Sequence, residues 1–132
     1  MHSVSRLLVS FTLFGCIAPT AQAIPPFYKQ FAEMYGGEDS ALPELDRKQA
    51  CFVCHQGKKK KNRNAYGEAL SEHLTKKDKA DVEKIIAALE TVATQSSNPE
   101  EEGAPTFGEL ITAGELPGGS LEQSMLEPEE LE

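Results

Sequence analysis

The sequence predicts an all-α protein. Apolar and aromatic residues recur every three or four positions in several segments, and polar residues that can cap a helix precede these runs. No segment alternates apolar and polar residues as a β-strand does, and no internal repeat is present. At 132 residues the chain is long enough for one domain. We therefore expect a single small helical domain.

Aromatic residues predict the first helix. Its buried face is a set of side chains at a spacing of four, with a methionine beside them: Phe27, Phe31, Tyr35 and Met34. Two glycines at positions 36 and 37 end this helix. A second, shorter helical turn is expected over residues 45–50, directly before a pair of cysteines.

A charged loop and a capped helix are expected next. Residues 58–63 are too charged to bury and predict a loop. Asn64 can cap a helix that runs to about Leu74, with Tyr66 and Leu70 on its buried stripe. Gly67 costs this helix about 1 kcal/mol relative to alanine. Its presence indicates close packing against a flat ring, a kink, or a helix that starts one residue later.

The clearest periodicity predicts a helix over residues 80–94. Its apolar face consists of Val82, Ile85, Ile86, Leu89 and Val92. Thr75 to Asp78 offers a helix start before it, with an acid near the positive end of the helix dipole. We expect residues 24–95 to form the main helical domain.

The C-terminal third has a different composition. Residues 96–105 are expected to be a linker, and Thr106 is expected to cap a short helix within residues 106–117 that packs on the domain. Residues 118–132 are acidic and have few apolar side chains to bury. We therefore expect them to be a flexible tail.

The N-terminus predicts export. Arg6 supplies a positive charge, residues 7–18 are largely apolar, and Ala21-Gln22-Ala23 has the small-x-small form of a cleavage site. Residues 1–23 are therefore expected to be a signal peptide, which places the mature chain in the periplasm or elsewhere outside the cytoplasm. The apolar run is shorter than the roughly 20 residues of a membrane-spanning helix, so no transmembrane segment is expected in the mature chain.

A second processing route remains open at Cys16. The sequence Leu13-Phe14-Gly15-Cys16 resembles a bacterial lipobox, in which the cysteine would be acylated and become the N-terminus. The phenylalanine before the glycine is bulkier than usual at that place, and the cleavage site at residues 21–23 competes with it. A lipid anchor at Cys16 is the alternative to simple cleavage.

Charge excludes one class of function. The formal net charge is −8, and removal of residues 1–23 takes away only Arg6, which leaves −9. A general nucleic-acid binder carries a positive footprint, so no nucleic-acid partner is expected. The charge is uneven: five of the six residues at 58–63 are basic, whereas residues 100–132 contain ten acids and no lysine or arginine.

Cys51-Phe52-Val53-Cys54-His55 is the candidate site. This C-x-x-C-H order is the pattern by which haem c is attached. A tight turn with two cysteines at this spacing lets both sulfurs reach the two vinyl groups on one edge of the porphyrin, and the histidine can then bind the iron. A helical domain this small also needs a disulfide, a metal or another buried group to supplement its core. We therefore expect one covalent haem c.

Three other uses of these residues stay open. Cys51 and Cys54 could form a disulfide that staples an interaction module without a cofactor. A thioredoxin-like redox pair would need a βαβ setting that the sequence does not predict. A structural zinc needs four ligands, and the mature chain offers only the two cysteines, His55 and His73, of which His55 directly adjoins Cys54.

The exported chain with this motif resembles the small bacterial c-type cytochromes. The segments 24–31, 58–70 and 106–118 look like those of short exported haem-binding proteins of unassigned role. The resemblance implies a cytochrome c-like helical domain around one haem, with Cys51 and Cys54 as thioether anchors, His55 as the iron ligand and single-electron transfer as the activity. An electron carrier makes or breaks no bond in a substrate, so an enzyme is not the preferred interpretation.

The second axial ligand of the iron is left open. Cytochromes of this class present a methionine downstream of the motif, but Met125, the only methionine there, lies in the acidic tail. His73 could bind the iron from the helix after the loop, and Met34 could reach it from the first helix, although both residues also fit ordinary roles. With no such ligand the iron would bind small molecules, and the protein would be a haem enzyme or a sensor.

The basic residues after the motif are candidates for partner docking. Lys58, Lys59, Lys60, Lys61 and Arg63 follow His55 so closely that they should lie near the exposed edge of the cofactor. A positive patch there would attract an acidic redox partner and raise its association rate. The same residues could also form a solvated loop that aids solubility, or be occupied by the protein's own acidic tail.

Overall fold

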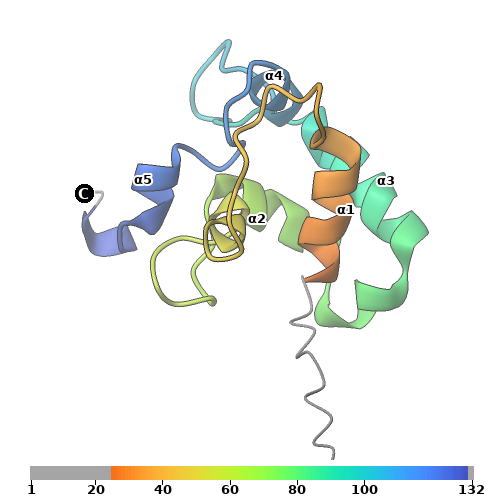
Figure 1. Cartoon of the computed structure of the whole chain (residues 1–132). Coiled ribbons are helices and arrows are strands. Elements are labelled where there is room, and N and C mark those ends of the chain that lie inside the picture. The colour runs from red at the N-terminus through yellow and green to blue at the C-terminus, as the bar shows by residue number, and fades with distance from the viewer. Residues whose placement is uncertain (1–24, 131–132) are drawn as a thin grey trace, which may run out of the picture.

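The computed structural model describes residues 25–130, and its regular structure is helical (Figure 1). The order of elements is α1 (Pro26–Tyr35), the 3₁₀ helix η1 (Gln49–Val53), α2 (Ala65–Ser71), η2 (Lys76–Ala80), α3 (Val82–Ala93), α4 (Phe107–Thr112), α5 (Leu121–Met125) and η3 (Pro128–Glu130). Within residues 25–130 the β-type pairing consists of two isolated bridges. The all-α prediction is therefore confirmed. The predicted signal peptide and Cys16 lie outside the described residues.

The predicted helix starts are largely confirmed. Pro26 occupies the first turn of α1, where its missing N–H costs no hydrogen bond. Asn64 caps α2 by accepting a hydrogen bond from the Gly67 N–H, and Thr75 and Thr106 each form a capping box at the start of η2 and α4. α2 ends at Ser71 and is therefore shorter than the expected helix, which ran to about Leu74.

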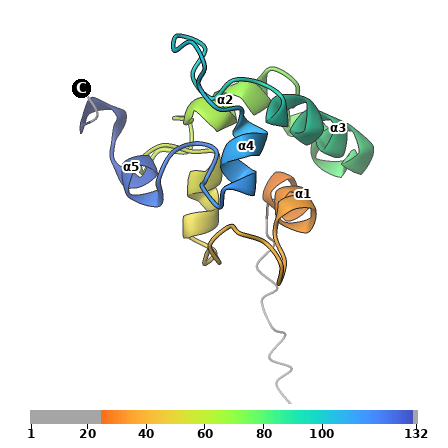
Figure 2. The ribbon, with the colours of Figure 1, turned by 90° about the horizontal axis from the view of Figure 1, so that it is seen from above.

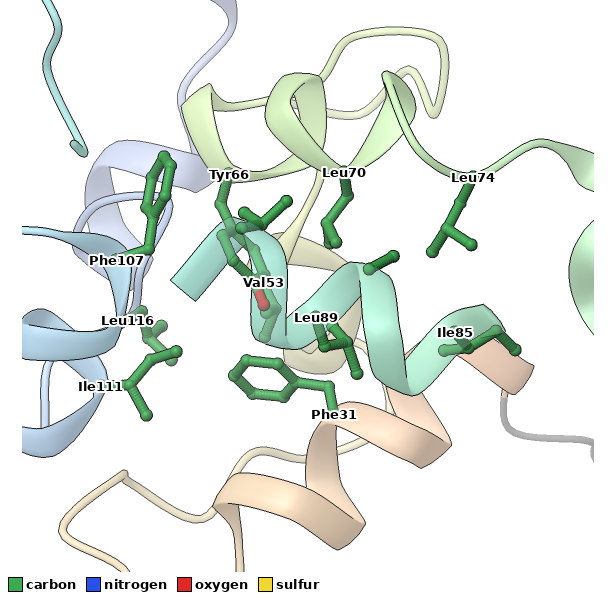
Figure 3. Close-up of a cluster of buried hydrophobic side chains, with 12 residues drawn as sticks. Phe31, Val53, Tyr66, Leu70, Leu74, Ile85, Leu89, Phe107, Ile111 and Leu116 are labelled. Atoms are coloured by element: carbon green, nitrogen blue, oxygen red, sulfur yellow. The ribbon is translucent and has the colours of Figure 1, made fainter. Parts of the chain in front are cut away.

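The core is a single cluster of side chains from α1, η1, α2, α3, α4 and the segments that follow α2 and α4 (Figure 3). Its members are Phe31, Val53, Tyr66, Leu70, Leu74, Ile85, Ala88, Leu89, Val92, Phe107, Ile111 and Leu116. Aromatic rings cross it: the Phe31 and Tyr66 centroids are 5.9 Å apart, and those of Tyr66 and Phe107 are 5.2 Å apart. Val53, between the two cysteines, is fully buried, so the motif is part of the core.

Helix α3 packs against α1 and presents most of the predicted apolar face. Ile85, Leu89 and Val92 are buried, and the Tyr35 hydroxyl donates a hydrogen bond to the Leu89 carbonyl at 3.3 Å. Val82 was expected on the same face but is 47% exposed. It is the first residue of α3.

The expected linker is a closed loop. Ser97 donates from both its N–H and its hydroxyl to the Pro105 carbonyl, at 2.9 and 2.7 Å, and the Phe107 N–H donates to the Gln95 carbonyl at 3.0 Å. The loop therefore returns the chain to the end of α3. Helix α4 then packs on α3. It is the short helix that was expected within residues 106–117.

The flexible tail is where the structure differs from the expectation. Residues 118–130 form α5 and η3, and α5 packs against η1 on the side of the molecule opposite α3 (Figure 2). Ser124 of α5 is fully buried. A capping box between Ser120 and Gln123 starts the helix. Hydrogen bonds to the segment that follows His55 hold the tail in place. The low apolar content of the tail did not predict this attachment.

No helix within residues 25–130 has the length and apolar character to cross a membrane. This finding agrees with the expected lack of a transmembrane segment in that part of the chain.

Candidate functional site

The cysteine segment is a tight helical turn. Cys51 lies within η1, Cys54 ends it, and His55 follows directly. The Cys54 and His55 N–H groups both donate to the Cys51 carbonyl, at 3.4 and 3.0 Å. Both thiols are free and partly buried. The turn expected for a C-x-x-C-H motif is therefore present.

The environment of Cys54 is apolar. Its side chain packs against the core cluster. Burial, and to a smaller extent the neighbouring Cys51, raise the pKa of the Cys54 thiol to about 12. A thiol with such a pKa stays protonated near neutral pH. Cys54 therefore lacks the thiolate character of a nucleophilic cysteine.

The imidazole of His55 is oriented by the backbone of the following loop. Its Nδ1 lies 3.2 Å from the Asn62 carbonyl oxygen, and His55 forms an isolated antiparallel bridge with Arg63. A neutral imidazole that donates from Nδ1 to this carbonyl has its lone pair on Nε2. Metal-binding histidines commonly donate their other ring N–H in this way. In this tautomer the Nε2 lone pair of His55 can act as a metal ligand.

Gly67 allows α2 to contact the cysteine turn. A Cβ at position 67 would overlap the Cys54 carbonyl oxygen. The sequence indicated a close approach to a flat ring, a kink or a later helix start. The structure instead gives a close approach to backbone, since Gly67 lies inside α2 and is buried against residue 54.

The basic loop is exposed and reverses sharply. Lys58, Lys59, Lys60, Lys61 and Arg63 all have exposed side chains. Arg63 lies 3.9 Å from the Glu68 carboxylate, an exposed and weak pair. In the part of the chain that the structure describes, no ion pair involves Lys58 to Lys61. These four charges are therefore available at the surface.

The C-terminal segment accepts hydrogen bonds from the backbone at the base of this loop. The Gly57 N–H donates to the Ser124 carbonyl at 2.8 Å, and the Lys58 N–H donates to a Glu127 carboxylate oxygen at 3.1 Å. The buried Gln56 amide donates to the Gln123 and Leu126 carbonyls, at 2.6 and 2.7 Å. The acidic tail therefore contacts the backbone at the base of the loop. The sequence interpretation in which the tail's acids occupy the lysine charges is not supported, because no ion pair among the described residues joins them.

The candidate second ligands lie in different places. His73 follows the end of α2, and its Nε2 is 3.4 Å from the Gln95 side-chain nitrogen. Met34 packs against the core cluster from α1. Met125 is 52% exposed on α5, the helix that packs on η1. The structure therefore brings the element of Met125 to the cysteine turn, which the sequence did not indicate.

Two buried hydroxyl groups have no hydrogen-bond partner among the described residues, Tyr66 Oη and Ser124 Oγ. Burial raises the pKa of the Tyr66 phenol, and the neighbouring Cys54 and Tyr35 add to the effect. Unpartnered buried hydroxyls are costly. Tyr66, whose pKa the Cys54 thiol affects, lies next to the cysteine turn.

The sequence missed the residues that hold the site together. Gln56, Ser124 and the side-chain donors of Asn64 were not singled out for this role. The S-x-x-Q pattern at residues 120–123 is a signal for α5 that could have been found, because it matches a capping box. Hydrogen bonds to backbone carbonyls leave no comparable pattern.

Within residues 25–130 no group of three or more His, Cys, Asp or Glu side chains is arranged to hold a metal ion. Comparison with known proteins finds no matching family model, no matching curated protein and no matching solved structure. The functional argument therefore depends on the site itself.

Proposed function

We propose that this chain is an exported c-type cytochrome that carries one covalent haem c and transfers single electrons. Cys51 and Cys54 would each add their S–H across a vinyl group, which forms a thioether and needs no oxidant. His55 would bind the iron through Nε2. The bound haem would supply the one-electron chemistry, and the protein would position it, set its potential and exclude water.

The observation that carries the proposal is the joint geometry of the three residues. The two thiols are free and lie on one tight turn, and the imidazole next to them is oriented by a backbone carbonyl at 3.2 Å from Nδ1. A disulfide module needs no oriented histidine. A structural zinc needs a fourth ligand, and His73 has the Gln95 side chain beside its Nε2.

The test is the visible spectrum of the chain expressed with the haem-attachment machinery of the bacterial periplasm. The proposal predicts haem absorption that stays with the polypeptide after denaturation. The variant Cys51→Ala/Cys54→Ala should lose that absorption on denaturation. A colourless parent chain would leave the disulfide-stapled module as the better interpretation.

Carbon monoxide binding separates the carrier from the second candidate, a haem enzyme or sensor with an open distal position. Resistance of the reduced protein indicates a six-coordinate carrier, and fast stoichiometric binding indicates the open site. If the parent resists, the variants His73→Gln, Met34→Leu and Met125→Leu identify the distal ligand, because removal of that ligand opens the iron to carbon monoxide.

Docking is proposed at the basic loop. Its lysines are exposed, and no ion pair among the described residues occupies them. At low salt the triple variant of Lys59, Lys60 and Lys61 to Gln should slow electron exchange with an acidic redox partner about tenfold. A matched triple change of Lys76, Lys77 and Lys79, which are exposed on η2, alters the net charge equally and should have little effect. Equal rates for both variants would leave the loop a role in solubility alone.

A further inference from the structure

Asn64 joins the cysteine turn to helix α2. It is 5% exposed, and its side-chain oxygen accepts a hydrogen bond from the Gly67 N–H at 3.0 Å. Its side-chain nitrogen donates to the Phe52 carbonyl at 2.9 Å and to the Val53 carbonyl at 3.1 Å. Its backbone N–H donates to the Cys54 carbonyl at 3.2 Å. One residue therefore binds three consecutive carbonyl groups of the C-x-x-C segment.

These contacts go beyond the needs of a helix cap. A cap requires only an acceptor, which aspartate or serine supplies as well as asparagine does. Only asparagine adds two N–H donors at this place, and both are used by carbonyls of the cysteine segment. The identity of residue 64 is thus explained by the turn rather than by the helix.

Two glycines enclose this arrangement. A Cβ at Gly118 would overlap the Asn64 amide, and a Cβ at Gly67 would overlap the Cys54 carbonyl oxygen. The backbone of the segment before α5 therefore packs directly on the amide, while α2 packs directly on the end of the turn. The amide has no room to leave its two carbonyl partners without moving one of these segments.

The loop that orients His55 is closed by the same residue. His55 pairs with Arg63 in an isolated bridge, and the Asn62 carbonyl receives both the Gln56 N–H, at 3.1 Å, and the contact from His55 Nδ1. The bond from the Asn64 N–H to the Cys54 carbonyl lies at the base of this loop. Loss of the Asn64 contacts would release the loop segment that contains Asn62, whose carbonyl orients His55.

We propose that Asn64 is a positioning residue, which fixes the C-x-x-C-H turn by binding the carbonyls of Phe52, Val53 and Cys54. It thereby sets the directions of the two sulfurs and of the His55 imidazole. The purpose of this role, presenting the three groups to a haem, rests on the proposed function.

The test compares Asn64→Ser with Thr106→Ala. Serine keeps an acceptor for the α2 cap and removes both side-chain donors. Thr106→Ala removes the cap of α4, which forms no hydrogen bond to residues 51–55 among the described residues, and so controls for the loss of a helix cap. Gly118→Ala is a second route to the same effect, because it displaces the Asn64 amide from its other side.

The test has one readout for protein that carries haem and another for protein that does not. In purified protein that carries haem, Asn64→Ser and Gly118→Ala should shift the midpoint potential and alter the spectrum of the iron, whereas Thr106→Ala should leave both unchanged. In purified protein without haem, the rate of Cys54 modification by a disulfide reagent should rise on the order of tenfold in Asn64→Ser over Thr106→Ala.

The presence of haem decides the proposed function, and the difference between variants decides the role of Asn64. Equal potentials for Asn64→Ser, Gly118→Ala and Thr106→Ala in the haem form would overturn the proposal. Equal thiol reactivities would overturn it in the form without haem. If Asn64→Ser does not fold, Gly118→Ala provides the comparison with Thr106→Ala.

Discussion

Two halves of this molecule are held together by different interactions. In the apolar half, formed by α1, α3 and α4, aromatic and aliphatic side chains pack in the core cluster. In the hydrogen-bonded half, formed by η1, residues 54–64 and α5, buried amides bind backbone carbonyls. Gln56 and Asn64 each donate two such side-chain bonds. The candidate site lies in the second half, with Val53 as its contribution to the core.

The difference shows how a site can be rigid without a large core of its own. Packing energy in the apolar half scales with the area that is buried. In the hydrogen-bonded half each bond contributes little, but a buried carbonyl left without its donor is costly. Changes in the apolar half should therefore lower the free energy of unfolding most, whereas changes in the other half should lower it less and also alter the site.

The largest effect is expected from the apolar half. Leu89 is 1% exposed on α3, and Leu89→Ala should lower the free energy of unfolding by about 2–5 kcal/mol. Denaturant titration measures the change. Val82→Ala, on the exposed first residue of the same helix, should stay within about 0.5 kcal/mol of the parent. Similar losses for both variants would contradict the observed orientation of α3.

Gly67→Ala tests the contact between α2 and the cysteine turn. Helix propensity alone favours alanine by about 1 kcal/mol, but its Cβ would overlap the Cys54 carbonyl oxygen. Overpacking of this kind costs about 1–3 kcal/mol, so a net loss of stability is expected, together with a shift in the His55 resonances. A variant more stable than the parent would mean that the approach is not tight.

Gln56→Met tests whether α5 is held by the two amide bonds. Methionine keeps the length of the side chain and removes both donors to the Gln123 and Leu126 carbonyls. The expected loss is about 1–2 kcal/mol, with faster hydrogen exchange at the Gly57 N–H, which is bound to Ser124. Glu122→Gln, an exposed change on α5, is the control. Unchanged exchange at Gly57 would show that other contacts hold the helix.

The smallest effect is expected at Asp78, beside the apolar half. Hydrogen bonds from Lys84 and from Thr75 lower the pKa of Asp78 from its usual 3.8 to about 2. Because the folded-state pKa is the lower one, the ionised carboxylate stabilises the fold at neutral pH, and this stabilisation is lost as the pH falls from about 4 to about 2. The melting temperature of the parent should exceed that of Asp78→Asn at pH 6, and the two should converge near pH 2. A difference that does not change with pH would contradict this origin.

The sequence predicted the apolar half well because packing leaves a period. Phe31 and Tyr35 on α1, and Ile85, Leu89 and Val92 on α3, recur at helical spacing and are buried or partly buried as expected. The period does not mark where the buried face of α3 begins, and Val82 was wrongly included in that face. Capping residues were also predictable, since their chemistry is local.

The hydrogen-bonded half could be predicted only in part. The motif predicted Cys51, Cys54 and His55 as the site, which stays a prediction, and the charges of residues 58–63 predicted an exposed loop, which the structure confirms. The attachment of α5 was missed because it depends on Gln56 and on backbone groups, which have no spacing rule. Asn64 was predicted as a cap, but its donors act across the fold and left no local signal.

The mass of the intact mature chain tests the central claim most directly. The account predicts that protein matured in a bacterium competent for haem attachment is heavier than its polypeptide by one haem, with the added mass on the peptide that contains Cys51 and Cys54. A folded, colourless chain with the mass of the polypeptide alone would contradict it.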